Sequence, residues 1–332
     1  MHPLSNRGVC LVLSVVAIAV LAVTPFIGQQ PVGLSVFFGE ISEQTRTIFY
    51  DIRLPRCCMA FLAGAGLAAA GMTFQALFQN DLASPFTLGV AGGAAFGAAL
   101  YVRLGIALTV LNIPGISLAA FVGALISMVL VYSLSRRMMG EGPTHVLLAG
   151  LAVNFTFTGA ISFVQYWSDY AGSFTIIRWL MGGLEVAGFG TVLQLLPLVG
   201  LGILAPFYYT RELNLITTGE EMAKSRGVRV KHVKLTLFVT SSLLVGGVVS
   251  FCGPIGFIGM MAPHMARRLV GGHHLYLTPA SVLLGGTFLT LSDTVARVVL
   301  APAELPVGVM TSLFGGPFFL WLLLRKRMGA TR

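Results

Sequence analysis

Ten runs of mostly apolar residues, separated by short connections, constrain this chain more than any other feature of its sequence. The runs lie at residues 8–28, 54–79, 87–106, 115–135, 144–167, 188–209, 233–252, 257–270, 278–298 and 306–324. A helix that crosses a membrane needs about 20 such residues. The run at 257–270 is short and rich in Gly and Pro, so we expect it to be broken or partly buried in protein. Because only 10% of the residues are charged, against about 25% in soluble domains, the sequence predicts an all-α polytopic membrane protein with about ten transmembrane helices.

The distribution of basic residues indicates which connections face the cytoplasm. Ten spans place both termini on one side of the membrane, and 15 Lys and Arg lie in or beside the connections on that side, against 6 on the other. An eight-span arrangement would break this separation. The positive-inside rule therefore places both termini in the cytoplasm. The net charge of +9 then reflects topology, and we expect no binding to nucleic acid.

The sequence lacks the common motifs of catalysis and cofactor binding. It has no G-x-x-x-x-G-K-[ST] loop, so any ATP would be bound by another chain. It has no H-E-x-x-H, C-x-x-C or G-x-S-x-G motif, and its four Cys are typical of small buried apolar residues. An intramembrane enzyme would need acid, base or metal groups that converge within the spans. We therefore predict that the chain is not an enzyme and binds neither a metal nor another cofactor.

The longest cytoplasmic connection, residues 210–232, predicts a short helix within "TTGEEMAKSRGV" at 217–228. Thr218 is expected to cap its N-terminus and Gly227 to end it, with acidic residues in the first turn and basic residues near the end. A short capped helix between two spans is suited to docking a cytoplasmic partner. The alternative is a solvated loop without a partner.

Three arginines, Arg53, Arg56 and Arg297, lie on the side that should be poor in basic residues. Arginine forms bidentate pairs with carboxylates, so this cluster predicts a docking site for an acidic surface of an outer partner. The alternatives are lipid headgroup contact or local pairing with Asp51 and Asp293. Asp293 and Arg297 are four residues apart on one helix face, which favours an ion pair between them.

Seven sequence blocks occur in an order and at a spacing that carry a family resemblance. The blocks are "RLPR" at 53–56, "FQALFQNDLASPFTLGVAGGAAFGA" at 74–98, "LLAG" at 147–150, "RWLMGGL" at 178–184, "LNLITTGEEMAKSRGV" at 213–228, "GPIGFIGMMAPHMAR" at 253–267 and "LSDTVARVVLAPAELPVGVMTSLFGGPFFLWLL" at 291–323. In this order they resemble the FecCD/BtuC-like family, the permeases of ABC importers for iron siderophores, haem and cobalamin. The ordered set covers nearly the whole chain.

The resemblance implies a single transmembrane permease domain over residues 1–332 with a BtuC-like permease fold, in a bacterial cytoplasmic (inner) membrane. It implies a second permease subunit, most simply in a homodimer, two ATP-binding cassette subunits that bind ATP and Mg²⁺, and a periplasmic or lipid-anchored substrate-binding protein. The binding protein would dock on the three outer arginines. The segment 213–228 would be the ATPase-coupling element, through Leu215, Thr218, Gly219, Glu220, Glu221, Ala223, Arg226 and Gly227.

The resemblance also implies a substrate path along the fifth and tenth spans, with a cytoplasmic gate at the turn into the fifth. Pro143 and Thr144 match the gate positions, although family members often have small hydroxyl residues at both. Asn154, Thr158 and Gln165 are the candidate path residues, and hydrogen bonding between helices is the alternative for each.

These observations predict the permease of an ABC importer that moves a ferric siderophore into the cytoplasm, driven by ATP hydrolysis on partner subunits. Haem and cobalamin are the alternative cargoes. A secondary transporter or channel that works without ATP is the alternative of a different class. No chain of Asp, Glu or His runs through the spans, so a proton relay of the kind found in proton-coupled transporters has little material here.

Overall fold

Each of the ten predicted spans corresponds to a helix in the computed structural model, which describes residues 5–30, 32–33, 35–38, 42–137 and 143–329. For residues 35, 38, 135–137, 143–147 and 322–329 the backbone alone is described. The helices are α1 (Asn6–Val23), α2 (Ser35–Phe38), α3 (Glu43–Thr47), α4 (Leu54–Phe78), α5 (Val90–Leu104), α6 (Gly115–Arg137), α7 (Pro143–Trp167), α8 (Tyr170–Leu180), α9 (Gly190–Tyr208), α10 (Thr210–Thr218), α11 (Glu220–Ser225), α12 (Val230–Cys252), α13 (Ile258–Val270), α14 (His274–Val298) and α15 (Val307–Gly329).

The all-α membrane fold is confirmed, whereas ten is an approximate count of spans. Within the described residues, seven helices are long and apolar enough to cross a membrane by length and composition. The predicted spans at 87–106 and 306–324 correspond to shorter apolar helices, α5 and the Val307–Trp321 part of α15. The run at 257–270 folds as α13, a largely buried helix of 13 residues with Pro263 inside it. Of the two outcomes expected for this run, burial in protein is the one observed.

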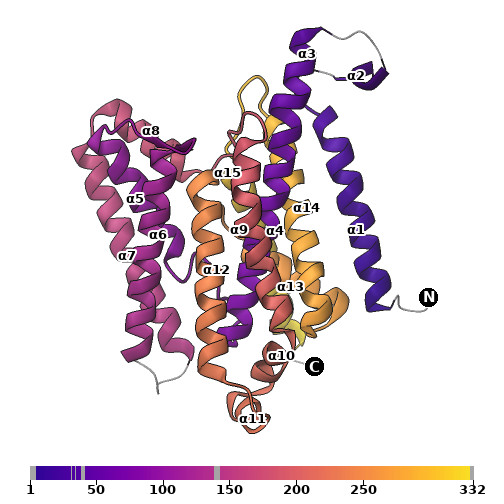
Figure 1. Ribbon diagram of the computed structural model, residues 1–332, viewed down its shortest axis with the longest axis vertical. Helices are drawn as coiled ribbons and strands as arrows, with labels where there is room; N and C mark the ends of the chain where they lie inside the picture. The colour runs from indigo at the N-terminus through magenta and orange to yellow at the C-terminus, as the bar shows by residue number, and fades with distance from the viewer. Residues whose placement is uncertain (1–4, 31, 34, 39–41, 138–142, 330–332) are drawn as a thin grey trace.

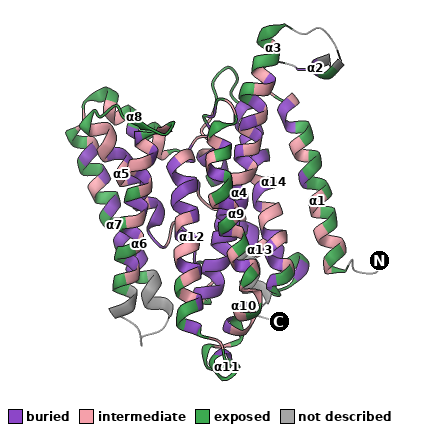
Figure 2. Ribbon diagram, viewed as in Figure 1, coloured by how far each residue is buried: buried purple, intermediate pink, exposed green. Residues whose placement is uncertain are grey.

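Helix α4 runs through the middle of the bundle and is almost entirely buried (Figure 2). Its composition of Gly and Ala allows close approach of its neighbours, since small residues let helix backbones touch. A Cβ atom on Gly64 would overlap the carbonyl oxygen of Gly285 in α14, and one on Gly71 would overlap Gly259 in α13. Small residues thus allow α4 to pack directly on the backbones of α13 and α14.

Helices α5, α6 and α7 form a second group beside α12 (Figure 1). The overlapping G-x-x-x-G steps of α5 face α6: Gly93 lies against Gly123, and Gly97 lies against Ala119. A two-residue hairpin, β1 (Thr109–Val110) with β2 (Ile113–Pro114), connects these two helices. The faces of α7 and α1 that point away from the bundle are exposed and apolar (Figure 2).

The two ends of the bundle differ in their short elements (Figure 1). The α3 end carries α3, α8 and the segment 299–306 between α14 and α15. The α11 end carries α10, α11 and the first turn of α1. A 3-10 turn (Thr24–Phe26) follows α1, and a π-helical turn (Ile48–Arg53) joins α3 to α4, so that helical backbone runs without interruption from Glu43 to Phe78.

Candidate functional site

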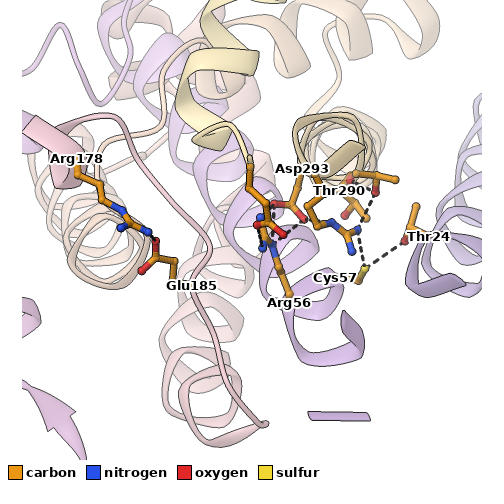
Figure 3. Close-up of polar contacts among 10 residues, drawn as sticks. Thr24, Arg56, Cys57, Arg178, Glu185, Thr290 and Asp293 are labelled. Carbon is orange, nitrogen blue, oxygen red and sulfur yellow. Dashed lines mark hydrogen bonds and ion pairs between the residues drawn. The ribbon is translucent and has the colours of Figure 1, made fainter. Parts of the chain in front are cut away.

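Arg56, in the first turn of α4, is the centre of an ion-pair network at the α3 end (Figure 3). Its Nε and Nη2 both lie 3.0 Å from Asp293 Oδ1, and its Nε lies 3.2 Å from Oδ2. Its Nη1 donates to Glu304 Oε2 at 2.6 Å. The Asp293 side chain is 1% exposed and that of Glu304 is 45% exposed. Arg56 therefore connects a buried carboxylate on α14 to an exposed carboxylate on the segment 299–306.

Arg297 lies one helical turn after Asp293 and pairs with the same carboxylate. Its Nε is 3.2 Å from Asp293 Oδ2, which confirms the ion pair predicted from their spacing. Its Nη2 donates to Thr294 Oγ1 at 3.2 Å and lies 3.6 Å from the sulfur of Cys57. With 4% of its surface exposed, Arg297 is a buried cation whose nearest carboxylate is Asp293.

Arg53, the last residue of the π-helical turn, fastens the end of α1 to the start of α4. Its Nη2 donates to the carbonyl oxygen of Gln30 at 2.7 Å, and its Nη1 lies 3.5 Å from the carbonyl oxygens of Pro25 and Phe26. The residue is 7% exposed. These carbonyl contacts replace the water that a guanidinium loses on burial.

The three predicted docking arginines therefore lie inward from the surface of the single chain. The alternative of local pairing with Asp293 is confirmed for Arg56 and Arg297, and the docking role stays a prediction. Sequence reasoning missed Glu304, the exposed member of the network, although it is an acidic residue within the last of the matching blocks. It also missed the pair of Arg178 with Glu185, whose side chains are 65% and 75% exposed at the same end (Figure 3).

The connection 210–232 contains two helices, α10 and α11, where one was predicted. The prediction that Thr218 caps the second helix is wrong, because Thr218 is the last residue of α10 and its hydroxyl donates back to the carbonyl of Leu215. Gly219 occupies the cap position with φ +139° and ψ +139°, a conformation open essentially to glycine alone. Gly227, with φ +80°, follows α11 as predicted.

Ion pairs hold α11 in place. Glu220 pairs with Lys234 of α12, and Glu221 accepts a hydrogen bond from Lys224 at 2.6 Å, which raises the pKa of the Lys224 ammonium. Ala223 is fully buried beneath them. Of the other predicted coupling residues, Leu215 and Gly219 are half-buried, whereas Thr218, Glu220, Glu221, Arg226 and Gly227 are exposed. The element thus presents a polar surface over an apolar anchor, and its coupling role stays a prediction.

The predicted path residues lie along α7. Asn154 is half-buried against Gly92 of α5, Gln165 is half-buried, and the exposed Thr158 donates its hydroxyl to the carbonyl of Asn154 at 2.9 Å. Pro143 and Thr144 begin α7, and their side chains lie outside the described residues.

A groove of about 720 Å³ lies elsewhere, between α8, α15 and two turns. Its lining is Ser84, Phe86, Thr87, Leu180, Met181, Pro254, Gly256, Phe257, Met260, Gly308, Val309, Ser312 and Leu313. The tenth predicted span therefore lines it, whereas Asn154, Thr158 and Gln165 do not. Phe257 has φ +66°, uncommon for a residue with a side chain, and a Cβ at Gly315 would overlap it. The block "GPIGF" was the available sequence signal for this turn.

The chain is similar to transport proteins along most of its length. The FecCD transport family matches residues 10–325. The hemin transport system permease HmuU of Yersinia pestis is 40% identical over 286 residues, which cover 84% of each chain. The cobalamin import permease BtuC of Halobacterium salinarum is 38% identical and covers 87% of this chain and 77% of its own. The iron(3+)-hydroxamate permease FhuG of Bacillus subtilis is 32% identical and covers 88% of each.

A solved structure of a metal-chelate type ABC transporter in an inward-facing conformation has the same fold. It aligns with a TM-score of 0.86 and 28% identity, and the alignment covers 96% of this chain and 99% of that one. The sequence and the fold agree over the same residues. The chain belongs to the FecCD transport family.

Proposed function

We propose that this chain is the membrane permease of a binding-protein-dependent ABC importer, and that its cargo is an iron chelate, with a ferric siderophore as first choice. The observation that carries the proposal is the family match across residues 10–325. The relatives named above handle hemin, cobalamin and iron hydroxamate, so haem and cobalamin are the competing cargoes. The whole chain acts as one multi-pass permease domain in a bacterial inner membrane.

The α11 end faces the cytoplasm in this proposal, and both termini lie there. The excess of basic residues in the connections of that end supports this orientation. Two ATPase subunits, which bind ATP and Mg²⁺, dock on α10 and α11, and this chain binds no cofactor itself. The exposed face of α11 is polar, and its buried Ala223 fixes the helix to the core. A partner that docks on this face and moves α11 must therefore move the buried contact as well, which supports a docking role.

The groove along α15 is proposed as one wall of the substrate path, and a second permease subunit supplies the opposite wall. Its lining is mostly apolar, with the hydroxyl groups of Ser84, Thr87 and Ser312 as its side-chain polar groups. Conduction requires binding that is weak enough to allow release. A wall without charged side chains suits a bulky chelate that must pass rather than stay.

The substrate-binding protein is proposed to dock at the α3 end on Arg53, Arg56 and Arg297. The pair of Arg56 with the exposed Glu304 supports this role for Arg56. A carboxylate of a docking protein would take the place of Glu304, which leaves the arginine paired before and after docking. Arg53 and Arg297 are buried and are proposed to have a second role. Arg297 shares Asp293 with Arg56 and so fixes the position of Arg56, and Arg53 fixes the segment after α1.

Reconstitution tests the proposal. The permease, a partner ATPase and the loaded binding protein are assembled in proteoliposomes, and uptake of a ⁵⁵Fe-labelled siderophore, haem and cobalamin is followed with and without ATP. We expect uptake of one of them that requires ATP and both partners. Uptake by the permease alone would instead favour a secondary transporter or channel. ATP hydrolysis by the permease alone would contradict the proposal that separate ATPase subunits hydrolyse ATP.

A further inference from the structure

Helices α4 and α14 pack closely against each other and run antiparallel (Figure 1). Their contact is made by small residues. Gly64 lies against the backbone of Gly285, and Gly285 against Ala68. Each helix has 25 residues, a length of about 37 Å at 1.5 Å per residue. We call these two helices the α4–α14 pair. Because their closely packed backbones leave no space for sliding, we treat the pair as one stiff element.

The α3 end of the α4–α14 pair is joined by the buried ion pair of Arg56 with Asp293. The carboxylate accepts two donors of one guanidinium at 3.0 Å. Geometry of this kind fixes the relative position of two helices more firmly than a single hydrogen bond, because both planar groups must stay aligned.

The α11 end of the pair is joined through α10. Gln79, which ends α4 with φ +47°, donates its side-chain amide to the carbonyl oxygen of Ile216 in α10 at 2.7 Å. Asn214 of α10 accepts the backbone N–H of His274, the first residue of α14, at 2.9 Å, and its Oδ1 lies 2.8 Å from His274 Nδ1. Helix α10 is therefore bonded to the residue that directly follows α4 and to the first residue of α14.

These bonds have an apolar support. Leu213 and Ile216 of α10 are fully buried in the main core, on either side of Asn214 in the sequence. The amide of Asn214 also lies 3.2 Å from the ring nitrogen of His273, so one side chain meets two consecutive residues at the start of α14. The ion pairs of α11, by contrast, connect it within itself and to α12.

We propose, on the basis of the function proposed above, that Asn214 and Gln79 are positioning residues that transmit the movement of α10 to the α4–α14 pair. A displacement of α10 by the ATPase then moves both helices together and reaches the ion-pair network of Arg56, Asp293 and Glu304 at the opposite end. The ATPase side and the binding-protein side of the membrane are thereby connected through one packed element rather than through the walls of the substrate path.

The test uses the complete importer in proteoliposomes and measures labelled chelate taken up per ATP hydrolysed. Asn214→Ala removes the bonds to α14, and Gln79→Gly removes the bond to α10 while suiting a φ of +47°. We expect uptake per ATP hydrolysed to fall about tenfold in each, a loss of coupling of the usual size, and complex assembly is measured on the same preparations. The matched control is Thr217→Ala, since both hydrogen bonds of its hydroxyl within the described part of the chain stay inside α10.

Two further measurements separate transmission from mere support of the fold. Asn214→Asp keeps the acceptor for His274 and is expected to restore most of the lost uptake. A nitroxide at Val299→Cys, an exposed residue at the end of α14, should change its mobility on ATP binding in the otherwise unchanged chain and lose that change with Asn214→Ala. Wild-type uptake per ATP in Asn214→Ala, or an unchanged nitroxide response, would overturn the inference. Failure of the unaltered importer to require ATP would instead overturn the proposed function.

Discussion

Arg56 and Asp293 are 237 positions apart in the sequence, yet two guanidinium nitrogens of the arginine lie 3.0 Å from one carboxylate oxygen of the aspartate. The aspartate has almost no exposed surface. Loss of one partner of a buried pair leaves an uncompensated charge, which is much more costly than loss of an exposed pair.

Asp293→Ala, which leaves the buried Arg297 without its nearest carboxylate, is therefore expected to lower the stability of the purified chain by about 3–5 kcal/mol. Thermal unfolding in detergent, followed by intrinsic fluorescence, measures the effect. The matched control is Arg178→Ala, because the pair of Arg178 with Glu185 is exposed and is expected to contribute less than about 1 kcal/mol. Equal effects of the two substitutions would show that the network of Arg56 does not stabilise the fold.

Glu304→Gln is expected to strengthen docking of the binding protein severalfold, because a neutral amide competes less well for Arg56 than a carboxylate does. Surface plasmon resonance on permease in nanodiscs gives the dissociation constant. The charge-reversing pair Arg53→Glu with Arg56→Glu should abolish docking. Unchanged docking by that double variant would refute the outer-face assignment, and weaker docking by Glu304→Gln would refute the exchange of carboxylates alone.

Gly219→Ala is expected to reduce ATP-driven uptake while the chain stays folded. The backbone at Gly219 has φ +139°, and a side chain there imposes a strain of about 1–3 kcal/mol on the junction of α10 with α11. Gly200→Ala is the control, since Gly200 lies inside α9 with open space around it. The ratio of uptake to ATP hydrolysis distinguishes a misplaced coupling element from an inactive complex.

Gly64→Ala is expected to destabilise the chain by about 1–3 kcal/mol, the usual effect of overpacking, because its Cβ would overlap the backbone of Gly285. Gly159→Ala, in α7 with no neighbour near its Cβ position, should be neutral or slightly stabilising, as alanine favours a helix. Parallel thermal unfolding of both variants checks the difference. A neutral Gly64→Ala would show that α4 and α14 can separate without cost.

Ser312→Trp should block chelate uptake and leave ATP hydrolysis intact, because Ser312 lines the groove along α15. Thr158→Trp places the same bulk on α7, the other span that the family resemblance implied for the path. If Thr158→Trp blocks uptake and Ser312→Trp does not, the path follows α7 and not the groove along α15. Comparison of uptake by the two variants therefore identifies which helix lines the path.

Features that depend on residues close together in the sequence were predicted better than contacts between residues far apart in the sequence. The apolar runs and the pair of Asp293 with Arg297 depend on residues near each other in the chain, and both were predicted. The bonds of Arg56 to Asp293 and of Gln79 to Ile216 join helices far apart in sequence. Periodicity carries no information about which helices become neighbours, so the bond of Gln79 was not predicted, and the pairing of Arg56 with Asp293 was given only as an alternative to docking.

The cap at the start of α11 shows a different limit. Thr218 is a good capping residue by type, and Glu221 lies three positions later. The residue after Thr218 is Gly219, however, and the backbone freedom of glycine lets the chain turn one position later than the pattern suggests. Thr218 then completes α10, and its hydroxyl satisfies a carbonyl of that helix instead. A local pattern was overruled by the backbone conformation open to its neighbour.

The uninterrupted helix from Glu43 to Phe78 has 36 residues and a length of about 54 Å at 1.5 Å per residue. The hydrocarbon core of a bilayer is about 30 Å thick. Even when tilted, this helix must extend beyond the lipid, and α3 stands at its far end (Figure 1). A protein approaching the membrane surface from this side would contact α3 before it reached the lipid headgroups. Arg53 and Arg56 lie further along the same continuous helix, so a partner bound to α3 would already be close to them.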